Sequence, residues 1–438
     1  MGLRDRNAFR AVLVVSWGAL ALGCSEAAPV RESTSGGVGG TAGSAEAPQA
    51  GSGGAGIGGR APGDGGGGGA PPEETEPPVA GGRELTANDV SVLFPLSGSG
   101  SALAFWAPSI EGKGGPLLPL SVYEQLPDNL LPNPLLPRAE EYELMRVVGV
   151  RFDPCFGDPC QGQIRLVLQG VMSDGIVFDG AAHLLYNLTD AEFLELTAAL
   201  RELGALAPEN TPSTPLGPSP AIEAQGMDGA YATALRELVT RYAGTENLAR
   251  VTFMTRSAAK TPVWSFGGLN LKFFEPLGTL ALAGLPPNTE LQHLTQAFGP
   301  AYGYAVSPEP TELAALMPII SSDASSSASE DERIAGYAAL TQVENPDLES
   351  PNTADCVSCH VANFIRGYLD ENYPTSAAPE TTYSGLAAAT RVVGEAETNV
   401  SNLRAFGYFA TGPSSVSPAI SQRTANETHH VLELLEAL

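Results

Sequence analysis

The chain has 438 residues and is strongly acidic, with 49 Asp and Glu against 23 Lys and Arg and a formal net charge of −26. Lysine occurs only at Lys113, Lys260 and Lys272, so no basic stripe is present to neutralise the phosphates of nucleic acid or of anionic lipid. This composition excludes nucleic acid as a partner and favours basic proteins, such as the lysine-rich faces found on many redox proteins.

The N-terminus carries the pattern of a secretion signal. Three arginines precede an apolar stretch over residues 11–22, which is too short to span a bilayer as a stable helix. The small residues that follow lead into Cys24, and this Ala-Leu-Gly-Cys run resembles the cleavage box of bacterial lipoproteins. The resemblance implies that residues 1–23 are removed as a signal peptide and that Cys24 is lipidated. The alternative is an ordinary signal peptide, cut at another small residue, which leaves Cys24 as an unpaired thiol.

The lipoprotein resemblance also implies a location. Ser25 follows the lipidated cysteine, and in this family that residue favours the outer membrane over the inner one. We therefore expect a protein of the cell envelope that is lipid-anchored and located at the outer membrane, facing the periplasm or the cell surface.

Residues 24–83 are expected to be a disordered tether. They consist largely of Gly, Ala, Ser, Pro and Glu and include five consecutive glycines at 65–69. Such a composition cannot bury a hydrophobic core. A flexible chain of this length has a root-mean-square span of roughly 40 to 45 Å, so the segment would hold the folded part away from the membrane.

Residues 84–320 predict an α+β domain whose role the sequence does not reveal. Alternating apolar residues predict strands, and capped segments with helical spacing predict helices. The expected strands cover residues 90–94, 142–152, 163–168, 175–178, 250–255 and 262–266, and the expected helices follow Thr189 and cover 229–243. The last two strands are expected to form a hairpin that buries Trp264 and Phe266. His183 lies in an apolar run and is expected to be an ordinary strand residue.

Cys155 and Cys160 enclose a short turn that contains Gly157 and Pro159. Such a turn can bring the two Cβ atoms within bonding distance, and an exported protein meets an oxidising compartment. We therefore expect a structural disulfide. A metal site is the competing interpretation, but neither flank supplies a histidine or a third cysteine.

The C-terminal part is expected to be a separate, mainly helical domain. A Ser-rich acidic run over residues 321–332 suggests a linker, and residues 333–438 are long enough for a compact helical unit. Apolar periodicity predicts a helix over 361–369 and a final helix from about residue 420.

The most specific motif is the pentapeptide Cys356-Val357-Ser358-Cys359-His360. It resembles the haem attachment site of c-type cytochromes. The resemblance implies one haem c, bound through thioether bonds to Cys356 and Cys359, with His360 as the proximal iron ligand. The alternatives are a plain disulfide between the two cysteines, a thioredoxin-like redox pair and a structural zinc site.

The sixth iron ligand is left open by the sequence. In the commonest c-type cytochromes it is a methionine that lies downstream of the motif, but no methionine follows His360. The remaining downstream donors are His429 and His430, of which at most one could reach the iron because consecutive helical residues point about 100° apart. An iron with an open position is the alternative. Other residues expected near the porphyrin are Phe364, Tyr368, Phe406, Tyr408 and Phe409 as walls, and Arg391 or Arg404 as propionate partners.

The sequence therefore predicts a membrane-anchored envelope lipoprotein with one covalent haem. We expect this protein to transfer single electrons to a redox partner protein and to be an electron carrier rather than an enzyme. An open iron would instead indicate a haem enzyme or a ligand sensor. The alternative from another class is a haem-free structural or binding lipoprotein with a Cys356–Cys359 disulfide.

Overall fold

The structure is a computed structural model. It describes residues 84–438 except for 97–103, 127–129, 132–135, 155–160, 173–174, 213–214, 258–262, 285–290, 297–301, 312, 375–378, 388 and 412–414. The predicted signal peptide, the lipidation site Cys24, the tether and the Cys155–Cys160 disulfide lie outside the described residues. Everything that is described belongs to one compact unit, Thr75–Leu438.

Helices and strands are combined in the described residues, as expected for the α+β class. The helices are α1 (Ala87–Val90), α2 (Leu120–Tyr123), α3 (Arg138–Leu144), α4 (Asp190–Gly204), α5 (Pro220–Gln225), α6 (Ala230–Tyr242), α7 (Ser322–Ser327), α8 (Glu330–Glu344), α9 (Cys356–Asn372) and α10 (Gln422–Glu436), with single 3-10 turns η2 (Glu275–Leu277), η3 (Ala314–Ile319) and η4 (Ser384–Ala387). The strands are β1 (Ser91–Leu93), β2 (Glu111–Gly112), β3 (Gly115–Pro116), β4 (Met145–Asp153), β5 (Gln163–Val171), β6 (Val177–Asn187), β7 (Leu248–Arg256), β8 (Val263–Phe274), β9 (Thr279–Gly284), β10 (Gln292–Gln296), β11 (Tyr304–Ser307), β12 (Phe406–Ala410) and β13 (Val416–Ile420).

A nine-stranded antiparallel sheet is the centre of the described part. Its strand order is β1-β4-β5-β6-β7-β8-β10-β11, and β9 pairs with β8. The predicted strands are present, although β6 and β8 extend well beyond the expected ranges, and residues 142–144, which were expected to begin a strand, belong to helix α3. The predicted hairpin is confirmed as β7 and β8, and it buries Trp264 and Phe266 completely or nearly so.

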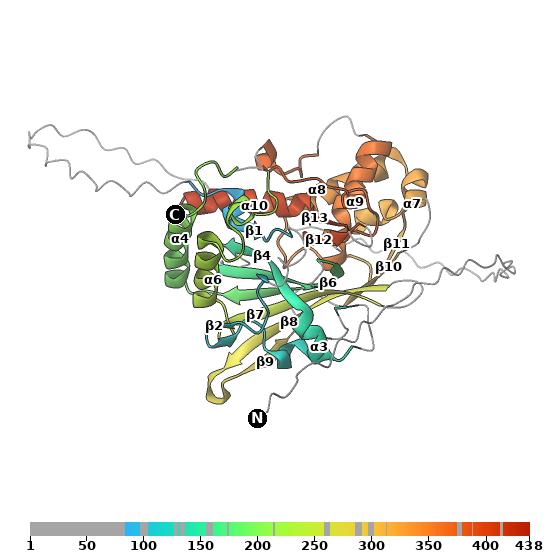
Figure 1. Cartoon of the computed structure of the whole chain (residues 1–438). Helices are drawn as coiled ribbons and strands as arrows, with labels where there is room; N and C mark the ends of the chain where they lie inside the picture. Colours follow the sequence, from blue (N-terminus) through green and yellow to red (C-terminus); the bar gives the residue numbers. More distant parts are fainter. Residues whose placement is uncertain are drawn as a thin grey trace, which may run out of the picture. The chain divides into compact units, whose positions relative to one another are not determined.

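The predicted helices α4 and α6 are also confirmed. At the start of α4, Thr189 Oγ1 accepts a hydrogen bond from the backbone N–H of Glu192 at 3.3 Å, and the Glu192 carboxylate accepts from the backbone N–H of Thr189 at 2.9 Å. This reciprocal capping satisfies N–H groups that a helix terminus leaves unpaired. The two helices lie together at one end of the sheet (Figure 1).

The expected linker over residues 321–332 is helical in the structure. Ser321 caps α7, and Ser329 caps α8 through a 3.2 Å bond from the backbone N–H of Glu332 to Ser329 Oγ. Serine and acidic residues are typical of loops, but they are also the residues that begin helices. Residues 321–332 therefore have the composition of a linker because they contain the N-termini of two successive helices, α7 and α8.

The C-terminal part is not separate from the sheet. It contains the β12–β13 hairpin in addition to helices, and Phe406 and Tyr408 of that hairpin share one buried cluster with the strands of the sheet. Val431 and Leu435 of α10 belong to the same cluster. The expected boundary between an α+β domain and a mainly helical domain is therefore absent from the described residues, because one hydrophobic core includes both.

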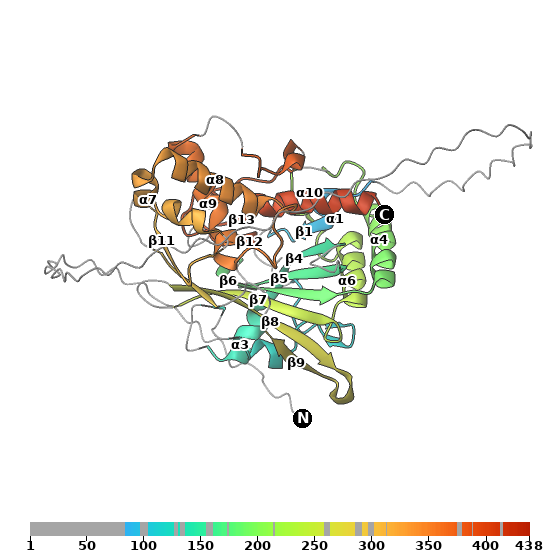
Figure 2. The same cartoon turned by 180° about the vertical axis from the view of Figure 1, so that it is seen from behind.

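Helices α8, α9 and α10 lie on one side of the sheet, as both views show (Figures 1 and 2). They are held to each other by buried polar contacts, such as the 2.8 Å bond from Asn426 Nδ2 to the carbonyl of Glu344. Within the described ranges, no helix combines the length and the apolar character that a membrane span requires.

Candidate functional site

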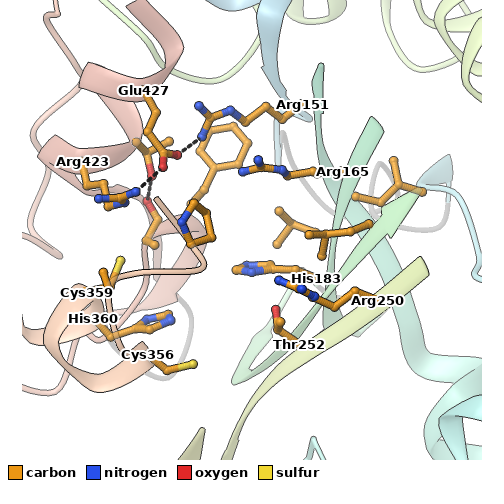
Figure 3. Close-up of a pocket in the computed structure, with 18 of the residues that line it drawn as sticks. Arg151, Arg165, His183, Arg250, Thr252, Cys356, Cys359, His360, Arg423 and Glu427 are labelled. Atoms are coloured by element: carbon orange, nitrogen blue, oxygen red, sulfur yellow. Dashed lines mark hydrogen bonds and ion pairs between the residues drawn. The ribbon is translucent and has the colours of Figure 1, made fainter. Parts of the chain in front are cut away.

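A pocket lies between the sheet and the C-terminal helices, and the Cys-x-x-Cys-His motif forms part of its wall (Figure 3). The empty space inside it, including its open mouth, is about 1010 Å³. Strands β4 to β7 form one wall, and the start of α9, the start of β12 and one face of α10 form the others. Its lining residues are Arg151, Arg165, Leu166, Val167, His183, Leu185, Arg250, Thr252, Pro351, Ala354, Asp355, Cys356, Cys359, His360, Ala405, Phe406, Arg423, Thr424 and Glu427.

Helix α9 begins at the motif and therefore aligns its reactive side chains. Asp355 is the N-cap, and its Oδ1 accepts a hydrogen bond from the backbone N–H of Ser358 at 3.0 Å. Residues three and four positions apart share one helix face, so Cys356, Cys359 and His360 all point into the pocket. The opposite face of α9, which includes Val361, is buried in the hydrophobic core.

The ring of His360 is held in one tautomer. Its Nδ1 is bonded to the backbone carbonyl of Leu403. A carbonyl can only accept, so Nδ1 carries the proton and Nε2 keeps its lone pair available. The ring also contacts Phe266, with the ring centroids 5.0 Å apart. Burial lowers the pKa of His360 to about 4, although the bond to Leu403 works in the opposite direction. A neutral imidazole oriented in this way is the form that binds a metal ion.

Cys356 and Cys359 are free thiols in the structure. Burial is the main reason why the pKa of Cys356 is raised to about 12 and that of Cys359 to about 11. Both thiols are therefore protonated at neutral pH, unlike the low-pKa cysteines of disulfide oxidoreductases.

On the sheet wall, three arginines lie in one row that crosses the strands. Arg151 of β4 is directly opposite Arg165 of β5, Arg165 is opposite Leu185 of β6, and Leu185 is opposite Arg250 of β7. Residues opposite one another on antiparallel strands share the same face of the sheet. Antiparallel pairing thus brings together cationic side chains that are up to about a hundred positions apart in the sequence.

His183 lies in the next row of the same sheet face. It is opposite Val167 of β5 and Thr252 of β7, and this row is about 7 Å from the arginine row because the two are separated by two residues along each strand. Figure 3 shows the His183 ring projecting into the pocket from the wall that faces His360. Burial, followed by the proximity of His360 and Arg404, lowers the pKa of His183 to about 3.

Glu427 of α10 ties the helical wall to the sheet wall. Its carboxylate accepts hydrogen bonds from Arg151 and, at 2.7 Å, from Nη2 of Arg423. Burial alone would raise the pKa of Glu427, but Arg151, Arg423 and Arg165 hold it well below its usual range. The carboxylate is therefore ionised at neutral pH.

The lining of the pocket has a surplus of positive charge. Four arginines, Arg151, Arg165, Arg250 and Arg423, are present with two carboxylates, Asp355 and Glu427. Burial lowers the pKa of Arg165 and of Arg250, although Arg165 is paired with Asp153 of β4 and Arg250 donates hydrogen bonds to Asn270 and Asn352. In a chain with a net charge of −26, this concentration of positive charge indicates a site for an anionic molecule.

The structure brings together only some of the residues that the sequence predicted. Cys356, Cys359, His360 and Phe406 line the pocket, and Arg404 lines a smaller cavity that shares His183 and His360 with it. The predicted distal candidates lie elsewhere. His429 is next to Tyr383 and Glu433, and His430 Nδ1 is 3.1 Å from a carboxylate oxygen of Asp347.

The other expected haem contacts also lie outside the pocket. Arg391 is paired with Glu397 and bonded to Asn363. Phe364 and Tyr368 pack against Tyr302. Tyr408 and Phe409 are buried, and Tyr408 donates a 2.5 Å hydrogen bond to the carbonyl of Phe94. These aromatic residues stabilise the core and do not form the walls of the site.

Sequence reasoning missed His183, the four arginines and Glu427. A signal was present, because Arg151, Arg165, His183, Arg250 and Thr252 are polar residues within otherwise apolar strands. The strand pairing needed to place them together was not available from one sequence.

Comparisons with known proteins found no match: no protein-family model, no curated protein and no solved structure resembles this chain. Among the residues that the structure places, no group of three or more His, Cys, Asp or Glu side chains is arranged to hold a metal ion.

Proposed function

We propose that this protein holds one haem c in the pocket between the sheet and α9, and that it transfers single electrons. Cys356 and Cys359 would form the thioether bonds, and His360 would be the proximal iron ligand. The observation that carries the proposal is that the three reactive residues of the Cys-x-x-Cys-His motif face one pocket that is lined by four arginines.

The lining of the pocket supports this assignment, because cofactor sites combine mostly apolar walls with a few charged groups that fix the orientation of the cofactor. Leu166, Val167, Leu185 and Phe406 supply apolar surface for a porphyrin. Phe406 reaches the pocket because Gly149 lies beneath it, and a Cβ at Gly149 would be 2.7 Å from the Phe406 ring.

The arginines match the anionic edge of a haem. A haem carries two propionates, and four arginines line the pocket. Guanidinium groups bind carboxylates through two parallel hydrogen bonds, which are stronger than bonds between neutral groups. Arg151, Arg165, Arg250 and Arg423 are therefore the proposed propionate partners, in place of Arg391 or Arg404.

When bound, a haem supplies a one-electron couple at the iron. The protein's own residues would bury the porphyrin and exclude water from it. The hydrogen bond from His360 Nδ1 to the Leu403 carbonyl would orient the ring so that the lone pair of Nε2 points into the pocket. We further propose that the chain is anchored at the outer membrane through a lipid on Cys24 and that its acidic surface, with a net charge of −26, binds a basic redox partner.

The test is to produce the full chain in a host with haem-attachment machinery and to measure its pyridine haemochrome spectrum and its polypeptide mass. We expect one covalent haem per chain and a reversible redox titration that fits a single electron. Cys356→Ala and Cys359→Ala should each lose one thioether bond, and the double variant should lose covalent haem completely.

Ser358→Ala is the matched control. Ser358 lies between the two cysteines, and its hydroxyl is buried without a hydrogen-bond partner in the described structure, so removing it leaves the motif and its packing unchanged. A colourless wild-type protein of unmodified mass would reject the proposal. If Cys356 and Cys359 were then found oxidised to each other, the haem-free lipoprotein would be the better interpretation.

A further inference from the structure

His183 differs from the other histidines of the chain in its contacts. His293 is bonded to Ser265, His360 to Leu403, His429 is next to Tyr383 and Glu433, and His430 is next to Asp347. For His183, by contrast, the part of the chain that the structure describes supplies no hydrogen-bond partner to either ring nitrogen. His183 is half-buried in the wall of the pocket, so its ring nitrogens are available to a ligand that binds there.

The surroundings of His183 identify the kind of ligand. The ring lines both the main pocket and the smaller cavity, and His360, Cys356 and Thr252 also line both of them. The ring projects from the sheet towards the space into which His360 projects from α9 (Figure 3). An imidazole nitrogen is a common ligand of haem iron, and two imidazoles on opposite sides of a pocket can bind the same metal from its two faces.

We infer that His183 is the second axial ligand of the haem iron. This inference rests on the proposed function, and it makes the iron six-coordinate and low-spin. The ligand comes from a strand that precedes the attachment motif by more than 170 positions in the sequence, so the axial pair would connect β6 directly to α9. An iron with both axial positions occupied carries electrons without binding exogenous small ligands, which is the behaviour of a carrier.

Met254 is the other side chain on this wall that could bind iron, because it lines the smaller cavity. Its side chain, however, belongs to the buried cluster that contains Trp264 and Phe266, and it is only 3% exposed. Met254 lies opposite Ala181, one row beyond His183 on the same sheet face. Met254 is therefore already packed, whereas the His183 ring has no polar partner.

The experiment uses the haem-loaded full chain and measures spin state by electron paramagnetic resonance and by optical spectroscopy. The wild type should be low-spin in the ferric form, and its ferrous form should not bind carbon monoxide. In His183→Ala the haem should remain covalently attached, most of the low-spin signal should be replaced by a high-spin signal, and carbon monoxide should bind. Added imidazole should restore the low-spin spectrum by binding at the iron position that the His183 side chain leaves open.

Controls and a second variant distinguish the possible failures. His429→Ala, His430→Ala and Met254→Leu should keep the low-spin spectrum. If His183→Ala does not accumulate, His183→Met should still bind iron but raise the reduction potential. Three results would each overturn this inference: a high-spin wild type, an unchanged spectrum of His183→Ala, or an unchanged spectrum and reduction potential of His183→Met. If the mass still shows covalent haem in such a case, the proposed function stands. Absence of covalent haem from the wild type rejects both.

Discussion

The buried carboxylate of Glu427 provides the most direct test of the charge arrangement in the pocket. Its side chain is 13% exposed, and its partners Arg151 and Arg423 are 9% and 6% exposed. Glu427→Gln keeps the size of the side chain but removes the charge and places an amide N–H₂ group next to a guanidinium. Both arginines would then remain buried with less compensation.

The expected loss follows from these burial values. Removing one partner of a buried ion pair costs about 3 to 5 kcal/mol. Because Gln keeps one acceptor oxygen, we expect the free energy of unfolding at pH 7 to fall by about 3 kcal/mol, at the low end of that range. Glu433→Gln is the matched control on the same helix; its side chain is 55% exposed, and we expect a change within about 0.5 kcal/mol.

The pH dependence has a definite sign. The pKa of Glu427 is held below its usual range in the folded state, so its stabilising contribution is fully present above the pKa of the unfolded chain, about 4.3, and is lost as the pH falls further. The stability gap between wild type and Glu427→Gln should therefore be constant from pH 7 to about pH 5 and then narrow by about 1.4 kcal/mol per pH unit below about 4.

Urea unfolding followed by circular dichroism at pH 7, 5 and 3 measures this gap, with every variant in the same haem-loaded form. A loss below about 1 kcal/mol at pH 7 would refute the structural role of the carboxylate. A gap of the same size at pH 3 and pH 7 would refute its assignment as an ionised group held by arginines.

Three further predictions concern backbone space, capping and redox potential. Gly180→Ala should destabilise the protein by about 3 kcal/mol, because a Cβ would overlap the carbonyl of Leu130. Gly367→Ala should instead stabilise it by about 0.5 to 1 kcal/mol, because Gly367 is on the exposed face of α9 and no atom lies within 4 Å of the new Cβ. Thermal unfolding temperatures that moved in the same direction for both variants would contradict this packing. Asp355→Ala should cost about 1 kcal/mol in urea unfolding, because it removes the cap of α9, and an unchanged midpoint would contradict the capping role. Arg250→Gln should lower the reduction potential of the haem-loaded protein by tens of millivolts, because it removes a positive charge that favours the reduced iron, and spectroelectrochemical titration showing a higher potential would refute the proposed contact.

Local signals explain which parts of the fold were predictable. Alternation in β4 and β5, and the Thr189 cap of α4, depend on residues within one short segment, and these elements were predicted correctly. The Ser-rich stretch from 321 to 332 was misinterpreted because serine and acidic residues are favoured both in loops and at helix N-termini. The β12–β13 hairpin was missed because its two strands are short, and Pro418 within β13 lowers the expectation of a strand.

The residues of the candidate site likewise fall into those that a local pattern predicts and those that only long-range strand pairing brings together. The spacing of Cys356, Cys359 and His360 is local, and the helix that begins at Cys356, five residues before the predicted start, places all three on one face. His183, Arg165 and the remaining sheet residues come together only through pairings between strands distant in sequence, which composition and periodicity do not reveal. His429 and His430 were the expected distal ligands because the sixth ligand of the commonest c-type cytochromes lies downstream of the motif, whereas His183 lies upstream of it.

The cross-strand row of arginines couples the chemistry of the pocket to the alignment of the strands. Successive side chains of a strand point to opposite faces, so inserting one residue before Arg165 in β5 would turn its guanidinium away from the pocket while leaving the composition almost unchanged. Inserting two residues would return it to the same face but displace it by one row, next to His183. Length changes within β4 to β7 should thus be tolerated far less than substitutions, and loop-length variation should be confined to the turns between these strands.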